Sequence, residues 1–369
     1  MVRSMDDNRD ILISGASVAG PALAWWLSRH GFHPTVVERA PQLRGGGYAV
    51  DFRGATHLAV LAKMGILDAI KARQTHLSAT TIVDEKGRPV APMPAHVFAG
   101  DVEILRGDLG RILYEATQDS TEYIFGDSIT SLDERADGVR VCFEHSQPRT
   151  FSLVIGADGL HSKVRRLAFG EDDRLVEDLG LCVSIFSTPD SAGLDHAGML
   201  CSVPGRTAGV FSAGDNQAIA QLYFATPSIS YDYRDVTQQK QIVAEAFADM
   251  GWRVPQLMAA MQQAPDFYFD SVSQVHLDRW AAGRSIRARH LGIGPMRGGV
   301  LPDRRRPMRT GRARRAPFRA GRRAGQRPHR VRASTRFGIG LASRRRQAGH
   351  RDAGRRRGWR TRLQGRRRT

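Results

Sequence analysis

The clearest hydrophobic pattern of the chain lies near its N-terminus, in residues 11–40. Ile11, Leu12 and Ile13 form a short apolar run of the kind that fills a buried parallel strand. After a glycine turn, residues 22–27 predict a helix that is apolar over much of its surface, and Gly31 suits its C-terminal end. A second apolar run follows at residues 35–37. The pattern therefore predicts a strand–turn–helix–strand unit.

Glycine and acidic positions in this unit indicate its chemistry. Gly15 makes the tight turn, and Gly20 lets the helix pack close to the sheet. Ser17 stands where a second glycine would let the backbone approach a pyrophosphate, and a small residue is tolerable there. Glu38 closes the second strand, where a carboxylate can accept hydrogen bonds from ribose hydroxyls. We interpret the unit as the site for the adenosine end of a dinucleotide; the alternative is a βαβ unit without a ligand.

A second motif, EILRGDL at residues 103–109, places Arg106 at a predicted strand-to-helix junction. In this position the guanidinium could pair with a phosphate or contact a flavin. The alternative is a solvated charge at the start of a helix.

A third motif, GADGLHSKVRR at residues 156–166, places Asp158 between two glycines at the end of a strand. Its carboxylate could accept from a ribose or ribityl hydroxyl. The basic residues that follow, Lys163, Arg165 and Arg166, either screen a pyrophosphate or are solvated helix charges.

Other elements are predicted from periodicity and from Gly and Pro positions. Residues 181–227 alternate through short strands broken by Gly and Pro, as expected of an antiparallel sheet. Further expected elements are a helix at 57–71, a hairpin at 81–90, strands at 139–143, 151–155 and 267–275, and helical structure at 238–261. A glycine-rich turn at 44–47 is expected to enter a strand near a ligand; the alternative is a surface hairpin loop.

Composition divides the chain in two. The 369 residues carry a formal charge of +18, but residues 284–369 contain 30 of the 55 basic residues, all arginine, and only two of the 37 acidic ones. Leu, Ile, Val and Phe make up 11 of these 86 residues, too few for a packed core. The first part is acidic and has the composition of an ordinary enzyme. We expect the C-terminal part to be a disordered, arginine-rich tail.

Cysteine usage and hydropathy limit the remaining classes. The three cysteines are widely spaced and no His/Cys cluster exists, so a metal site is not expected. No run approaches 18 apolar residues, and the N-terminus is too acidic for a signal peptide. These features predict a soluble cytoplasmic protein without a membrane partner.

Together, GASVAG with Glu38, EILRGDL and GADGLHSKVRR resemble, in order and spacing, the motifs of single-component FAD-dependent aromatic hydroxylases, whose prototype is para-hydroxybenzoate hydroxylase. The segments GGGYAVDFRG and DFYFDSVSQVHLDRW look more like the branch that acts on tetracyclines and related polyketides. The resemblance covers residues 10–283.

This resemblance implies an α/β fold of two lobes. Residues 1–75 and 100–175 would form an FAD-binding, Rossmann-like lobe of the glutathione-reductase type, with a parallel sheet. Residues 76–99 and 176–283 would form a mostly antiparallel sheet that covers the isoalloxazine, and residues 284–369 the tail.

It also implies a cofactor site and a reaction. Gly15, Ser17, Gly20 and Glu38 would hold the ADP half of FAD with Arg39 beside them; Arg106 and Asp158 would contact the cofactor near the flavin. NADPH or NADH would be a transient co-substrate. In the family, the reduced flavin forms a C4a-hydroperoxide that hydroxylates an electron-rich carbon, and no catalytic proton-transfer residue is assigned here.

The family's later Gly-Asp-Ala motif is missing, and no apolar strand of the right kind follows Gly283. One explanation for both this absence and the lack of lysine in the tail is a reading-frame shift or a rearrangement, which the nucleotide sequence read in three frames tests. The alternatives are a nucleic-acid-binding extension and another kind of disordered tail. We therefore predict a monooxygenase that hydroxylates an aromatic or polycyclic substrate. The alternatives are an inactive flavoprotein remnant or a protein that associates with nucleic acid through the tail. The tail is expected to bind nucleic acid only non-specifically. The sequence indicates no oligomeric state.

Overall fold

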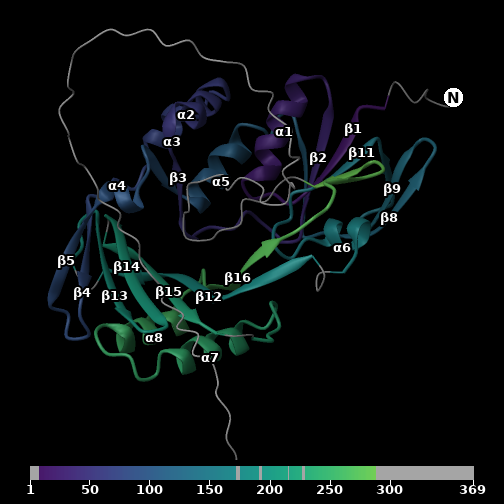
Figure 1. Cartoon of the computed structure of the whole chain (residues 1–369). Helices are drawn as coiled ribbons and strands as arrows, with labels where there is room; N and C mark the ends of the chain where they lie inside the picture. The colour runs from purple at the N-terminus through teal and green to yellow at the C-terminus, as the bar shows by residue number, and fades with distance from the viewer. Residues whose placement is uncertain (1–7, 172–174, 191–192, 215, 227–228, 288–369) are drawn as a thin grey trace, which may run out of the picture. The chain divides into compact units, whose positions relative to one another are not determined.

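The computed structural model describes residues 8–171, 175–190, 193–214, 216–226 and 229–287, all within one compact unit, Met1–Val300 (Figure 1). Their strands form two large sheets and two small ones. The predicted tail lies outside these residues except for its first four positions.

One large sheet has six strands in the order β17-β18-β11-β1-β2-β7. These strands are β1 (Asp10–Ser14), β2 (His33–Glu38), β7 (Glu122–Phe125), β11 (Leu153–Gly156), β17 (Ala281–Ala282) and β18 (Ser285–Arg287). All neighbours are parallel except β17 and β18. Because β1 has a parallel neighbour on each side, Leu12 and Ile13 are fully buried. The predicted parallel sheet around residues 11–13 is confirmed.

Helices pack against this sheet and against one another. They are α1 (Ala19–Arg29), α2 (Gly54–Lys63), α3 (Leu67–Lys71), α5 (Arg106–Glu115) and α6 (Lys163–Phe169). Trp25 of α1 joins Ile70 of α3 and Leu109 of α5 in one apolar cluster. The two-stranded sheet of β3 (Ala49–Phe52) and β6 (Val102–Leu105) contributes Ile104 to the same cluster.

The second large sheet has seven strands in the order β16-β12-β15-β14-β13-β4-β5. They are β4 (Ala79–Val83), β5 (Pro89–Pro94), β12 (Val176–Pro189), β13 (Ala197–Val203), β14 (Arg206–Gly214), β15 (Gln217–Ala225) and β16 (Tyr268–Val275). Only the pair of β13 and β4 is parallel. The predicted fold class, a parallel sheet with a mostly antiparallel one, is confirmed.

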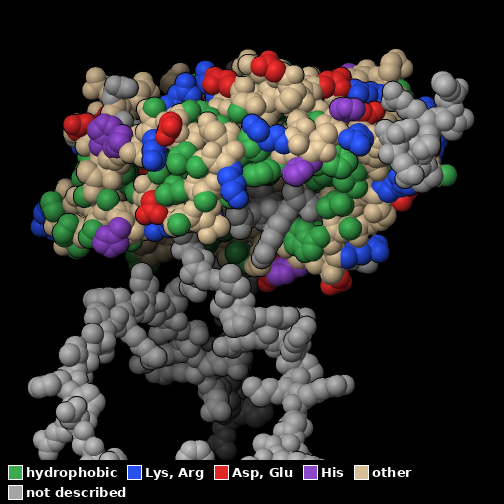
Figure 2. Space-filling view, turned by 90° about the horizontal axis from the view of Figure 1, so that it is seen from above, with side chains coloured by type: hydrophobic (Ala, Val, Ile, Leu, Met, Phe, Trp, Pro, Cys, Tyr) green, Lys and Arg blue, Asp and Glu red, His purple; other side chains and the backbone are tan. Residues whose placement is uncertain are grey.

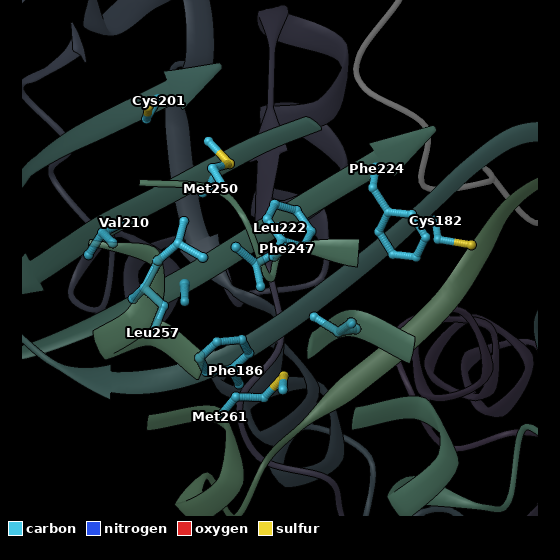
Figure 3. Packing of buried hydrophobic residues seen from close by; sticks show 14 of the residues in the cluster. Cys182, Phe186, Cys201, Val210, Leu222, Phe224, Phe247, Met250, Leu257 and Met261 are labelled. Atoms are coloured by element: carbon cyan, nitrogen blue, oxygen red, sulfur yellow. The ribbon is translucent and has the colours of Figure 1, made fainter. Parts of the chain in front are cut away.

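Helices α7 (Val236–Ala246) and α8 (Val254–Gln263) cover one face of the seven-stranded sheet (Figure 1). Phe186, Leu222 and Phe224 from the sheet pack there against Phe247, Met250 and other residues of the helical segment (Figure 3). Alternate residues of β15 therefore face this core, and those between them face the other way.

Three predicted elements differ from the structure. The predicted helix at 57–71 ends at Lys63 and restarts at Leu67, because Gly65 between them takes a positive φ of 71°. The predicted helical segment 238–261 is likewise two helices, with Trp252 at a φ of 57° between them.

The predicted strand at 151–155 is in fact the end of β10 (Arg149–Phe151) and the start of β11. β10 pairs with β9 (Gly138–Phe143), which in turn pairs with β8 (Ile129–Arg135), so the two pieces belong to different sheets. Ser152 lies between them and donates two hydrogen bonds to the Asp10 carbonyl oxygen.

After Gly283 the sequence predicts no apolar strand of the Gly-Asp-Ala kind, and the described residues contain a shorter strand of a different kind. Ser285–Arg287 form β18, which pairs in parallel with β11 and extends the six-stranded sheet. It was missed because it is only three residues long and contains one apolar residue, Ile286. These three residues lie at the start of the segment that the sequence analysis assigned to the tail.

Two further features concern membrane-spanning helices and the distribution of surface charge. No helix among the described residues is both long and apolar enough to cross a membrane. On the face seen in Figure 2, acidic and basic side chains are interspersed among hydrophobic ones.

Candidate functional site

The turn after β1 is built by two glycines that no other residue can replace without movement. Gly15 has a φ of 110°, and a Cβ atom there would lie 2.5 Å from the Ala157 carbonyl oxygen. A Cβ atom on Gly20 would lie 1.9 Å from the Gly15 carbonyl oxygen. The turn, the start of α1 and the segment after β11 thus approach one another at backbone distance. The predicted close packing at Gly20 follows from this contact.

The N-terminus of α1 is left open toward a ligand. Its N-cap residue, Val18, provides no side-chain hydrogen bond, and its first turn has no acidic residue. Free N–H groups and the positive end of a helix dipole favour an anion such as a pyrophosphate. Ser17, beside this terminus, accepts a hydrogen bond of 2.6 Å from Nη1 of Arg106. The structure therefore brings together Ser17 and Arg106, which are 89 positions apart in the sequence.

At the end of β2, Glu38 is held by the backbone. One carboxylate oxygen accepts from the Ala16 N–H and the other from the Ala40 N–H, both at 2.9 Å. Nη2 of Arg44 lies 3.8 Å from Oε1 of Glu38. A carboxylate has about four acceptor positions, so Glu38 retains capacity for ribose hydroxyls.

Asp158 is more fully engaged within the protein. Its carboxylate accepts from the hydroxyls of Ser14 and Ser162 and from the backbone N–H groups of Lys163 and Val164. Three of these four donors reach Oδ2 and one reaches Oδ1, so most of the acceptor capacity of the carboxylate is used within the protein. Asp158 thus holds the turn before α6 in place, and its direct contact with FAD stays a prediction.

The proposal that Arg165 screens a pyrophosphate is wrong. Its side chain is fully buried and donates to the carbonyl oxygens of Gly159 and Leu160. Lys163 and Arg166, in contrast, line the cavity described next. The helix turns Arg165 inward between them, which spacing along the sequence alone did not reveal.

These groups lie around one cavity of about 1950 Å³. Of the predicted cofactor residues, Gly15, Ser17, Glu38, Arg39, Arg106 and Asp158 line it, whereas Gly20 lies behind the turn. A typical drug-sized ligand needs a pocket of roughly 300–1000 Å³. The cavity therefore has room for a dinucleotide and a second molecule.

The seven-stranded sheet forms the opposite wall with the face that does not contact α7 and α8. On β15, Ile219, Gln221 and Tyr223 line the cavity. Neighbouring strands add Val183, Leu200, Thr207, Phe211 and Tyr268. Sequence reasoning assigned none of these residues to a site. The two-residue alternation of β15 was a signal for two different faces, but not for which face meets a ligand.

Asp270 of β16 connects the two walls. It is 5% exposed and accepts hydrogen bonds from Tyr231 at 2.6 Å, from Tyr268 at 3.1 Å and from Nε2 of His161 at 3.1 Å. Burial and the adjacent Asp270 charge raise the pKa of Tyr268 well above its ordinary value. The ring of His161 also stacks on Tyr233 at 4.7 Å. The turn after β11 is thereby attached to the antiparallel sheet.

The site fits a dinucleotide such as FAD on three structural grounds. The glycine cradle admits no Cβ, the α1 N-terminus is uncapped, and the Glu38 carboxylate lies in the same cavity. Gly15, Ser17 and Arg106 would hold the pyrophosphate and Glu38 the ribose.

Comparison with known proteins agrees with this fit. The family model described as "FAD binding domain" matches residues 8–225. A flavin-dependent monooxygenase of Legionella longbeachae serogroup 1 (strain NSW150) is 37% identical over 79% of this chain and 76% of the relative. The chain belongs to the FAD-dependent monooxygenases.

Two further matches support the assignment of this chain to the FAD-dependent monooxygenases. The FAD-dependent monooxygenase asL4 of Sarocladium schorii is 32% identical over 74% of this chain and 67% of its own length. The crystal structure of the tetracycline destructase Tet(51) superposes with a TM-score of 0.70 and 34% identity, covering 76% of this chain and 74% of that one. The predicted family, enzyme class and FAD cofactor are therefore confirmed.

Proposed function

We propose that this monooxygenase uses NADPH or NADH and dioxygen to hydroxylate an aromatic or polycyclic, polyketide-like substrate. When bound, FAD supplies the chemistry that passes electrons from the nicotinamide to dioxygen. The protein supplies binding, orientation and exclusion of water.

The observation that carries the proposal is the single cavity between two different walls. One wall is the glycine cradle with Glu38 and Arg106; the other is the sheet face with Leu200, Phe211 and Ile219. The first suits a charged dinucleotide and the second a flat apolar ligand. The similarity to a tetracycline destructase supports a ligand of several fused rings.

The test is reconstitution of the full chain with FAD, followed by turnover with NADPH or NADH and a panel of phenols with one to four rings. We expect incorporation of one labelled oxygen atom from dioxygen into a polycyclic phenol, measured by mass spectrometry. NAD(P)H oxidation that yields only hydrogen peroxide with every compound would contradict hydroxylation. Turnover of single-ring phenols alone would contradict the polycyclic substrate.

A further inference from the structure

Two carboxyl groups that are not among the residues assigned to the cofactor face each other in the cavity wall. The antiparallel register of β3 and β6 places Asp51 directly opposite Glu103, and both line the cavity. Residues in such positions have Cβ atoms about 5 Å apart, so their side chains interact. Two like charges there repel unless one of them carries a proton.

The carboxyl groups of Asp51 and Glu103 have different hydrogen-bond partners. The Asp51 side chain is 6% exposed and accepts from the Gly100 N–H at 2.7 Å and from Nη2 of Arg53 at 3.4 Å. Glu103 accepts from the Thr75 hydroxyl and also interacts with Asp51. Glu103 has fewer hydrogen-bond donors than Asp51, and its pKa is raised above the ordinary value.

Burial is the main cause that raises the pKa of Glu103, to about 7. The Thr75 hydrogen bond lowers it, Asp51 raises it through its charge and a shared hydrogen bond, and Arg53 lowers it. Beyond Thr75, His196 donates to the Thr75 carbonyl oxygen at 2.7 Å and stacks edge-on against His76. Near neutral pH both forms of Glu103 are populated, the condition that suits a general base.

The surroundings of Glu103 define the ligand it would meet. Leu105, two residues further along β6, and Leu77, two residues beyond Thr75, also line the cavity. An apolar ring system with one acidic hydroxyl matches a carboxyl group set among apolar side chains.

We propose that Glu103 accepts the proton of a phenolic or enolic hydroxyl on the substrate, with Asp51 and Thr75 as positioning residues. This inference rests on the proposed function and narrows it to polycyclic substrates that bear an acidic hydroxyl. In the step, the substrate O–H bond breaks and its electron pair stays on the substrate oxygen. The proton bonds to a Glu103 carboxylate oxygen and then passes to water. The resulting phenolate ring is richer in electrons and reacts more readily with an electrophilic oxygen.

The experiment uses the FAD-loaded full chain and two flat four-ring probes, 1-hydroxypyrene and 1-methoxypyrene, which differ in the hydroxyl donor. Dissociation constants are measured by fluorescence at pH about 6 and about 8, on either side of the Glu103 titration. At the higher pH the hydroxyl probe is expected to bind about tenfold or more tightly than the ether, because it donates to a charged carboxylate. At the lower pH this preference shrinks, because Glu103 is protonated. The absorption band of bound phenolate reports the proton transfer itself.

Three variants and a control sharpen the test. Glu103→Gln abolishes the pH dependence and the phenolate band. Asp51→Asn moves the onset of the preference to lower pH, and Thr75→Val moves it to higher pH, since one removes a charge that raises the pKa and the other a hydrogen bond that lowers it. Glu115 lies on the exposed end of α5 and outside the cavity lining. Glu115→Gln therefore leaves the preference for the hydroxyl probe, its pH dependence and the phenolate band unchanged. If Glu103→Gln fails to fold, Asp51→Asn and Thr75→Val still test the role of Glu103, because they are expected to shift the onset of the preference to lower and to higher pH, respectively.

Equal affinity for the two probes at both pH values overturns the role of Glu103, even if FAD binds and NAD(P)H is oxidised. Failure of both probes to bind overturns the polycyclic substrate class and this inference with it. Failure of FAD to bind overturns the proposed function by itself, in a separate titration.

Discussion

The two walls of the cavity are built by different means. On the parallel-sheet side, binding groups come mostly from turns: the backbone after β1, the end of β2 and the segment after β11. On the antiparallel side they are side chains at every second position of neighbouring strands, such as Ile219, Gln221 and Tyr223. A turn can be identified from a few adjacent residues, whereas a sheet face exists only once strands have paired. Side chains of the sheet face can therefore change without altering the turns that build the other wall.

The largest expected effect breaks the cradle. Gly20→Val places a branched side chain against the Gly15 carbonyl oxygen, where a Cβ atom would lie 1.9 Å away. We expect a loss of about 4 kcal/mol or more in the free energy of unfolding, with loss of FAD binding, measured by urea unfolding and flavin titration. Gly110→Ala is the control for the unfolding measurement alone, because the residue is inside α5 and, apart from its own helix backbone, nothing lies within 4 Å of its added Cβ, whereas Gly110 itself lines the cavity. That variant should be about 0.5–1 kcal/mol more stable, and similar stability of the two variants would contradict the steric argument.

The next effect tests the connection between the walls. Asp270→Ala leaves Tyr231, Tyr268 and His161 without their common acceptor. Removing one member of such a buried charged network costs about 3–5 kcal/mol in the free energy of unfolding. Tyr231→Phe removes one donor to Asp270 and one acceptor of the Ser271 N–H, which also donates to Asp270, and should cost about 1–2 kcal/mol. Urea unfolding at constant pH measures both, and equal costs would show that the donors do not depend on one carboxylate.

A third prediction concerns ribose binding on the cradle side. Glu38→Ala removes the acceptor at the end of β2, and a charge-assisted hydrogen bond contributes about 1.5–3 kcal/mol. FAD affinity should fall roughly 10- to 150-fold, as measured by quenching of flavin fluorescence. Glu122→Gln is a suitable control, since Glu122 starts β7 and is outside the cavity lining. Unchanged FAD affinity in the Glu38→Ala variant would show that Glu38 does not bind the ribose.

The smallest effect is a pH dependence on the side of Glu103. Its pKa is raised from 4.5 to about 7 on folding, so between these values the unfolded chain holds fewer protons than the folded one. Stability should therefore fall as pH rises through this window, by about 1–2 kcal/mol after allowance for solvent screening. Glu103→Gln should flatten this part of the profile, measured by unfolding at several pH values. A profile identical to that of the wild type would show that another group titrates there.

Sequence reasoning was most successful where function depends on the backbone. The spacing of Gly15, Gly20 and Glu38 predicted the βαβ unit and a dinucleotide site, because a glycine needed at a close contact cannot be exchanged. The FAD cofactor was implied by the resemblance of three motifs to a known family. Arg106 was predicted to contact the cofactor; its hydrogen bond to Ser17 now brings it to the cradle, while the FAD contact itself stays a prediction. The division into two lobes also stays a prediction, although β4 and β5 do pair within the sheet of the later strands.

Sequence reasoning failed where position depends on distant partners. The inward turn of Arg165, the short strand β18 and the split of β10 from β11 all result from contacts with elements far along the chain. The same holds for Asp270 and His161, which are 109 positions apart and meet only in the folded protein.

The sequence by itself determined the glycine turn and the kinds of sheet, since these depend on local turns and on the periodicity of apolar residues; the enzyme class followed from the resemblance of three motifs to a known family. Tertiary structure alone decided which sheet face lines the cavity and which carboxyl groups share it. Asp51 and Glu103 look unremarkable along the chain, and only the register of β3 and β6 places them opposite each other. The physical reason is that the acidity of a side chain depends on burial and on neighbouring charges, which strand pairing brings together.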